Sequence, residues 1–251
     1  PATQPAEILT IANHMLGTGQ LSLAKFLFIT ADPENKLNTK NIEQYFQFVL
    51  ERIHLDRDVH FYTNTTVDTL DYSGEQLNKG SKVVFAAYGN PVRKLSSETL
   101  PELSEIRGYK GARMVKPGIL ALGAASQYKN AVEAKQEIQS LCEHISQLIK
   151  EKQTLAVKKE EEIVLIVLCD DPVFLSENLN NFLWTTFTRS NPSHDIYGVN
   201  EFIENKHWGC KGPLLIDARA KPHHAPAVEK DPETEKKINR LFEKGGSLFG
   251  Y

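Results

Sequence analysis

The stretch KFLFITADP, residues 25–33, recurs 139 residues further along the chain as VLIVLCDDP, residues 164–172. Each is a nearly continuous apolar run followed by an acidic residue and a proline, which is typical of a strand buried on both faces that ends in a turn. A helical pattern follows each strand, and we predict its start at Thr39 in the first copy and at Ser176 in the second. Self-similarity at a fixed offset indicates that one supersecondary unit is used twice. Residues shared by both copies are therefore expected to serve the fold rather than a reaction.

The repeat predicts an α/β fold. Strands that alternate with helices favour a layered αβα sandwich, with a mixed sheet built from two related strand–helix–strand units. The sequence leaves open whether the copies share one continuous sheet or form two adjoining sheets. Further positions that align between the copies are Arg52 with Arg189, Asp58 with Asp195, and residues 80–84 with residues 212–216.

The pattern along the chain suggests three segments. Residues 1–90 form a first α/β unit, 91–160 an insert with a strand and a long helix, and 161–251 a second α/β unit with a terminal helix that starts at Asp231. Between Ala131 and Leu148, apolar residues recur at spacings of three and four, and we call this stripe the seam. The seam fits a helix lying across the sheet and equally a helix at an interface between two copies, so self-association through it is one expectation.

The composition is that of an ordinary globular protein. The chain of 251 residues is 41% hydrophobic and 24% charged. Its formal net charge of -3 gives no electrostatic reason to expect nucleic acid or an anionic membrane as a partner. Three cysteines, the absence of a long apolar run and the absence of a signal pattern predict a cytoplasmic location without a transmembrane segment. Because the chain begins at Pro1 without a methionine, we interpret it as a piece of a longer protein.

Residues that could carry chemistry are few. In the pair Asp170-Asp171, only Asp171 is shared with the first copy, and its position before a proline favours a turn role over catalysis. His207 and Cys210 lack the second clean pair of ligands that zinc requires. The basic stretch 221–224 is short and is interpreted as a surface turn. No dinucleotide fingerprint, P-loop or nucleophile elbow is present, so we assign no catalytic, cofactor-binding or metal-binding residue.

Several phrases nevertheless resemble the UbiD family of decarboxylases. The longest is LGTGQLSLAKFLFI, which resembles the phrase that leads into an apolar strand and an acidic turn in that family. The other phrases follow it in the same order as in the family. Together the phrases are residues 16–29, 57–59, 67–73, 215–219, 221–222 and 231–233. The insert from about Asn90 to Lys159 departs from the family pattern, since it separates the opening unit from the phrases that resemble the closing strand and terminal helix.

The resemblance implies the C-terminal domain of a carboxy-lyase that acts on aromatic or unsaturated carboxylic acids. In the family, prenylated FMN and a metal ion are bound by a preceding domain, which also supplies the catalytic Glu-Arg-Glu set. This sequence has no counterpart of that glutamate motif. The expected partners are therefore the rest of the parent decarboxylase, further copies of the chain, and a small acid substrate bound by the parent.

A loop after the second strand helps to wall the substrate pocket in the family, and the resemblance places it here at residues 66–72. The implied wall residues are Thr66, Val67, Asp68, Leu70 and Tyr72, with a plain surface turn as the alternative. A second hypothesis for the whole chain is a duplicated α/β interaction or ligand-sensing module without catalysis.

Overall fold

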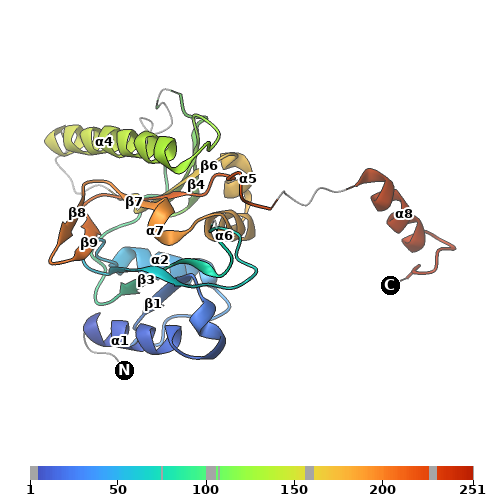
Figure 1. Ribbon diagram of the computed structural model, residues 1–251, viewed down its shortest axis with the longest axis horizontal. Coiled ribbons are helices and arrows are strands. Elements are labelled where there is room, and N and C mark those ends of the chain that lie inside the picture. Colours follow the sequence, from blue (N-terminus) through green and yellow to red (C-terminus); the bar gives the residue numbers. More distant parts are fainter. Residues whose placement is uncertain are drawn as a thin grey trace.

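The computed structural model describes residues 5–74, 76–99, 106, 108–155, 161–225 and 231–250. Figure 1 shows alternating layers of helices and sheets. Helix α1 lies outside the first sheet, helices α2, α5, α6 and α7 lie between the two sheets, and α4 lies outside the second. The predicted α/β layering is confirmed, and the two copies form separate sheets.

The first unit forms a three-stranded sheet in the order β1-β3-β2. Strand β1 pairs parallel with β3, and β2 pairs antiparallel with β3. Helix α1 packs Ile8 and Ala12 against Val84 and Ala86 on the outer face. The elements are α1 (Pro5–Leu16), the 3-10 helix η1 (Gly19–Leu23), β1 (Phe26–Thr30), α2 (Ile42–Arg52), β2 (Val59–Thr66) and β3 (Lys79–Ala87).

The second unit repeats this topology in the order β6-β10-β7, with one parallel and one antiparallel pair. Strand β5 adds parallel to β6 and β4 adds antiparallel to β5, so the second sheet has five strands. The elements are β4 (Ala112–Lys116), β5 (Ile119–Gly123), β6 (Leu165–Cys169), α5 (Pro172–Glu177), α6 (Leu179–Thr188), α7 (Pro192–Asp195), β7 (Ile196–Gly198) and β10 (Leu214–Asp217). A separate hairpin joins β8 (Glu201–Glu204) to β9 (His207–Cys210).

Both predicted helix starts are wrong by a few residues. Helix α2 begins after Asn41, whose side chain accepts the backbone N–H of Gln44, and not at Thr39. In the second copy α5 begins directly after Asp171, and a second cap at Asn178 starts α6. The single helix expected in the second copy is therefore divided into α5 and α6. Each of the two starts where an asparagine or aspartate side chain accepts the free N–H groups of the first helical turn.

The shared aspartates hold turns in both copies. Asp58 accepts the backbone N–H of His54 at 2.9 Å, and Asp195 accepts that of Asn191 at 2.6 Å. Each carboxylate therefore closes the turn immediately before β2 or β7. Asp32 and Asp171 likewise accept two backbone N–H groups each, just after β1 and β6. This agrees with the expectation that shared residues serve the fold.

Helix α4 (Ala131–Leu155) decides between the two interpretations of the seam. Its residues Ala134, Ile138, Leu141 and Ile145 are buried. They pack against Leu120, Ile166 and other side chains on the outer face of the second sheet. Because burial of these side chains in the chain's own core removes them from solvent, the seam is a helix lying across the sheet and is not available to a second copy.

The last helix, α8 (Pro232–Phe242), starts where the sequence predicts. The side chain of Asp231 accepts the backbone N–H of Glu233, and proline occupies the first helical position. No side chain of α8 is buried. Among the helices of the described residues, none combines the length and the apolar character needed to cross a membrane.

Candidate functional site

A cleft of about 670 Å³ opens between the two units. Its walls come from four places: the ends of β2 and β3 that meet at their connection, the start of α4 with the residues just before it, the α7–β7 region with the segment after β10, and the β8–β9 hairpin. Tyr128, Tyr197 and Trp208 contribute aromatic surface, while Asp195 and Lys221 contribute buried charges. A concave surface with aromatic walls and a few polar groups is what small-molecule sites commonly present.

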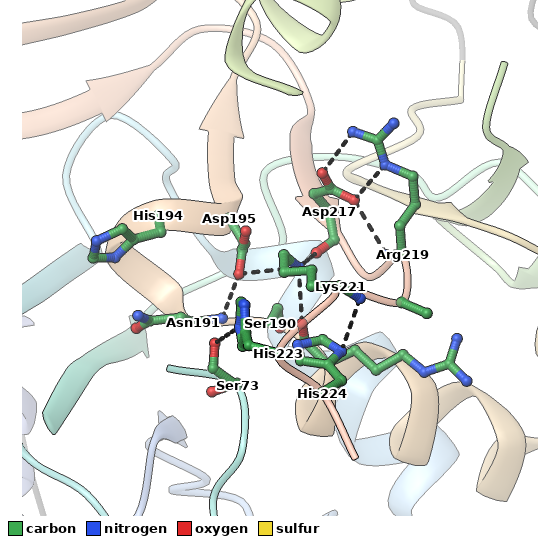
Figure 2. Close-up of polar contacts among 12 residues, drawn as sticks. Ser73, Ser190, Asn191, His194, Asp195, Asp217, Arg219, Lys221, His223 and His224 are labelled. Atoms are coloured by element: carbon green, nitrogen blue, oxygen red, sulfur yellow. Dashed lines mark hydrogen bonds and ion pairs between the residues drawn. The ribbon is translucent and has the colours of Figure 1, made fainter. Parts of the chain in front are cut away.

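Lys221 is buried beside this cleft, and its ammonium has three oxygen partners. Figure 2 shows its ammonium among three oxygen acceptors. Its Nζ donates to the carbonyl of Arg189 at 2.9 Å and to that of Asp217 at 3.1 Å, and it lies 3.3 Å from Oδ2 of Asp195. A buried ammonium requires such partners, because its desolvation costs several kcal/mol. Lys221 therefore ties together the end of α6, the end of β10 and the start of β7.

The carboxylate of Asp195 is the acidic partner in this cluster. Burial raises the pKa of Asp195 to about 6, although the charge of Lys221 and the N–H of Asn191 act in the opposite direction. Burial and then the charge of Lys221 lower the pKa of His224 to about 4. Nδ1 of His224 accepts the backbone N–H of Lys221 at 3.2 Å, so the neutral ring carries its proton on Nε2.

Lys25 forms a second, neighbouring pair in the first unit. Its Nζ donates to Oδ1 of Asp71 at 3.0 Å and to the hydroxyl of Ser73 at 2.8 Å. Both members of the ion pair are largely buried. Burial lowers the pKa of Lys25, and the negative charge of Asp71 opposes this shift. The pair anchors the loop after β2 to the residue that precedes β1.

One contact joins the two clusters across the boundary between the units. Nε2 of His223 lies 3.3 Å from the backbone carbonyl of Ser73, as Figure 2 shows. Nearby, the side-chain amide oxygen of Asn191 accepts from the backbone N–H of Ser81 at 3.2 Å, and both residues are buried. Polar contacts, and not only the apolar core, therefore fix how the first unit meets the second.

Arg219 attaches α4 to the same region. Its Nε and Nη2 form two parallel hydrogen bonds to Asp217, at 2.9 and 2.8 Å, and its Nη1 donates to Glu137 at 2.6 Å. This bidentate geometry is the strongest form of an arginine–carboxylate pair. It positions the first turns of α4, which line the cleft, on the end of β10.

Comparison with known proteins identifies the first unit. Residues 2–87 match the model of the 3-octaprenyl-4-hydroxybenzoate carboxy-lyase C-terminal domain. These residues belong to the UbiD C-terminal domain family. The matched segment contains both Lys25 and Asp71, so two phrases that resemble the family in sequence are joined by one buried ion pair.

Relatives from Chlamydia match almost the whole chain. An uncharacterized protein of Chlamydia muridarum is 33% identical over 238 residues, which cover 95% of this chain and 37% of that protein. A protein of Chlamydia pneumoniae, named as a 4-hydroxybenzoate decarboxylase subunit, is 32% identical over 239 residues, which cover 94% of this chain and 36% of the relative. The chain thus spans just over a third of the length of these curated relatives.

The UbiD match covers the first unit and ends at residue 87, before the insert. Within this unit β3 pairs with β1 on one side and with β2 on the other. That the insert separates the opening unit of the family from its closing strand stays a prediction. The phrases at 215–219, 221–222 and 231–233 lie outside the matched residues, in the second unit and α8.

The structure places the five implied wall residues of the UbiD domain in different surroundings. Thr66 ends β2, and Val67 is buried against Gly80, where an added Cβ would lie 3.0 Å from a Val67 methyl. Asp68 accepts the backbone N–H of Leu70 and closes a turn. Leu70 is 75% exposed and Tyr72 is 56% exposed. Among the described residues that line the cleft, none is one of these five, although Thr63, Asn64 and Ser73 flank them on either side.

Sequence reasoning missed the buried lysines. The interpretation of residues 221–224 as a surface turn is wrong for Lys221, which is 6% exposed. Lys25 belongs to a family phrase, but nothing in its local sequence predicts its burial. The turn role of Asp171 is confirmed, while Asp170 pairs with Arg189 at 3.2 Å. Within the described ranges, no group of three or more His, Cys, Asp or Glu side chains is arranged to hold a metal ion, and His207 and Cys210 lie at opposite ends of β9.

We predict that Lys25→Met lowers the free energy of unfolding by about 3 kcal/mol, because it leaves the carboxylate of Asp71 largely buried without its ammonium partner. Urea unfolding of the 251-residue chain measures this. The matched control is Lys36→Met, which removes an exposed pair with Glu34 and should change stability by less than about 0.5 kcal/mol. Equal effects of the two substitutions would show that the buried pair has no special weight.

We predict that Asp195→Asn changes how stability depends on pH. Since the folded-state pKa of Asp195 is raised to about 6, its contribution to stability is full below about pH 4 and is lost as the pH rises to about 6. The asparagine variant should lack this loss, so its unfolding free energy relative to the wild type should rise across that window. His224, with its lowered pKa, gives a slope of opposite sign in both proteins and largely cancels in the comparison. A difference that does not vary between about pH 4 and pH 7 would contradict the prediction.

Proposed function

We propose that this chain is the C-terminal, assembly and pocket-closing part of a UbiD-like carboxy-lyase that decarboxylates aromatic or unsaturated carboxylic acids. The observation that carries the proposal is the family match at residues 2–87, supported by the Chlamydia pneumoniae relative that is named as part of a decarboxylase. The alignment with that relative extends over 94% of the chain, so it includes the second unit as well as the matched domain.

The described side chains do not fit the family's cofactors. No cluster of three or more metal-ligating residues occurs among them. The sequence also contains no glycine-rich phosphate-binding fingerprint that follows a strand. The proposal therefore assigns prenylated FMN and its metal ion to the rest of the parent enzyme, and it gives the residues of this chain no covalent role.

The role proposed for this chain is to present the loop at residues 66–72 to the substrate. The base of the loop is held firmly, because Val67 is buried and Asp71 is paired with Lys25. Its outer residues Leu70 and Tyr72 are exposed. A loop with a fixed base and exposed apolar side chains can cover the hydrocarbon part of an aromatic or unsaturated acid without losing much conformational entropy.

The alternative, a non-catalytic ligand-sensing or interaction module, draws its support from the cleft between the units. That cleft has aromatic walls from Tyr128, Tyr197 and Trp208 and depends on the second unit, which lies outside the family match. The residues that precede this segment in the intact gene product discriminate between the two. A flavin-binding domain with glutamate and arginine motifs favours the decarboxylase.

The decisive experiment compares the intact parent with the 251-residue chain. We expect the parent, reconstituted with prenylated FMN, to release carbon dioxide from at least one member of a panel of aromatic and unsaturated acids. The isolated chain should show neither release nor a change in the flavin absorption spectrum. A spectral shift on mixing the chain with prenylated FMN would contradict the cofactor assignment, and a parent inactive on the whole panel would overturn the decarboxylase assignment.

The pocket-wall role predicts a selective effect of Leu70→Asp in the parent enzyme. Loss of an apolar contact with the substrate should raise KM by about tenfold with little change in stability, because Leu70 is 75% exposed in this chain. The matched control is Ile203→Asp, since Ile203 is 74% exposed on the β8–β9 hairpin. If both substitutions change KM equally, the loop is a surface turn.

A further inference from the structure

The cleft between the two units has an aromatic wall that the family match does not include. Tyr128, Tyr197 and Trp208 all lie beyond residue 87, where the match ends. The cleft volume of about 670 Å³ is within the range of sites that hold a small organic molecule. The charges and hydrogen-bond donors on its walls indicate which kind of molecule it can hold.

The negative charges on the walls already have partners within the chain. Asp195 accepts the backbone N–H of Asn191 and pairs with Lys221, as Figure 2 shows. Glu201 accepts the backbone N–H of Gly198 at 3.2 Å. Both carboxylates therefore hold the two ends of β7, and neither requires a cation from solution.

Two positive charges on the walls have no such partner. Lys79 begins β3 in the first unit, and Lys135 lies in the second turn of α4. Both side chains are exposed, and neither forms an ion pair with another described residue. Since Lys221 is offset by Asp195, these two ammonium groups outnumber the one remaining carboxylate on the described walls, that of Glu201. The excess of positive charge favours an anion.

The hydroxyl of Tyr197 adds a neutral hydrogen-bond donor. Burial, and then the negative charge of Asp195, raises the pKa of Tyr197, so the phenol keeps its proton at neutral pH. Among the described residues, none forms a hydrogen bond with this hydroxyl. It can therefore donate to an acceptor oxygen of a molecule in the cleft.

The aromatic wall is fixed before any ligand binds. The ring of Trp208 meets that of Phe61 edge to face with centroids 5.2 Å apart, and an added Cβ at Gly198 would lie 3.1 Å from it. The ring of Tyr128 has the ammonium of Lys221 at 5.2 Å from its centre. Because these rings are already held, a flat ring can pack against them with little loss of conformational entropy.

We propose that the cleft binds a small planar organic anion. Its ring packs on the aromatic wall, and its carboxylate or phosphate is held by Lys79, Lys135 and the hydroxyl of Tyr197. Lys79 belongs to the first unit and the other two residues lie beyond the family match, so the bound anion bridges the two units. The proposal does not depend on the decarboxylase assignment, because none of the described residues at 66–72 lines the cleft.

Titration calorimetry of the 251-residue chain tests the proposal with three probes of one shape. Naphthoate and naphthyl phosphate carry the two kinds of anionic group, and naphthamide is their neutral counterpart. At least one anion should bind saturably, and naphthamide should bind at least about tenfold more weakly. The tighter of the two anions identifies the acidic group that the site takes. If neither anion binds, or if naphthamide binds as tightly as the anions, the proposal is overturned.

Substitution of single lysines locates the site. Lys79→Gln and Lys135→Gln should each raise the Kd of the anion by at least about fivefold, because each removes one positive charge from the walls. Tyr197→Phe keeps the ring, removes the donor and should also weaken binding. The matched control is Lys129→Gln, since Lys129 is exposed, pairs with Glu133 and is not among the described residues that line the cleft. Its Kd should stay within about twofold of the wild type. Equal effects of the three lysine substitutions would show that only the overall charge attracts the anion, and the site would be wrong.

Tryptophan fluorescence tests the aromatic wall separately. The chain has two tryptophans, so Trp208 is the only one left in Trp184→Phe. In this variant naphthoate should change the Trp208 emission saturably, with the Kd that calorimetry gives. Emission that stays constant while calorimetry reports saturation would place the anion elsewhere on the chain and overturn the proposal. Far-UV circular dichroism verifies that each variant is folded.

Discussion

The burial of one ammonium group, that of Lys221, constrains the junction on which the second unit and the cleft depend. A charge taken out of water requires acceptors, and it finds them at the end of α6, at the end of β10 and on Asp195. These acceptors are separated along the chain, so Lys221 joins elements that the order of the sequence keeps apart. His223 consequently lies against the first unit, where its Nε2 is 3.3 Å from the carbonyl of Ser73, while His224 accepts the backbone N–H of Lys221 itself.

The duplication shows how such a junction can arise from a structural motif. In the first copy the carboxylate of Asp58 closes the turn before β2 and pairs with Arg57, whose side chain is about half exposed. In the second copy Asp195 closes the same turn, but its cationic partner is the buried Lys221, supplied from beyond β10. The turn is retained while the partner changes from a neighbour to a distant residue. A fold-serving aspartate has thereby become part of the boundary between the units.

These particulars show what the sequence could and could not predict. The repeated strands could be predicted because burial on both faces imposes a continuous apolar run, as in residues 165–169.

The division of the second-copy helix at Asn178 could not be predicted. Whether a helix stops at a capping residue or continues through it depends on a small difference in free energy, which local hydrogen bonds decide. The burial of Lys25 and Lys221 depends on acceptors far away in the chain. No local pattern indicates such acceptors, and lysine side chains are almost never fully buried unless they are paired.

The two units consequently differ in how much of their surface other elements of the chain cover. The first matches the UbiD C-terminal domain over residues 2–87, and in it the β1–β3 pairing and the Lys25–Asp71 pair fix the loop at residues 66–72. The second repeats the topology, yet its added strands and α4 enclose its outer face. Large apolar side chains of this unit that stay exposed lie on several other elements, among them Phe174 on α5, Trp184 on α6 and Ile203 on β8. Because α4 buries its apolar stripe against the sheet, that stripe is not available to a second copy.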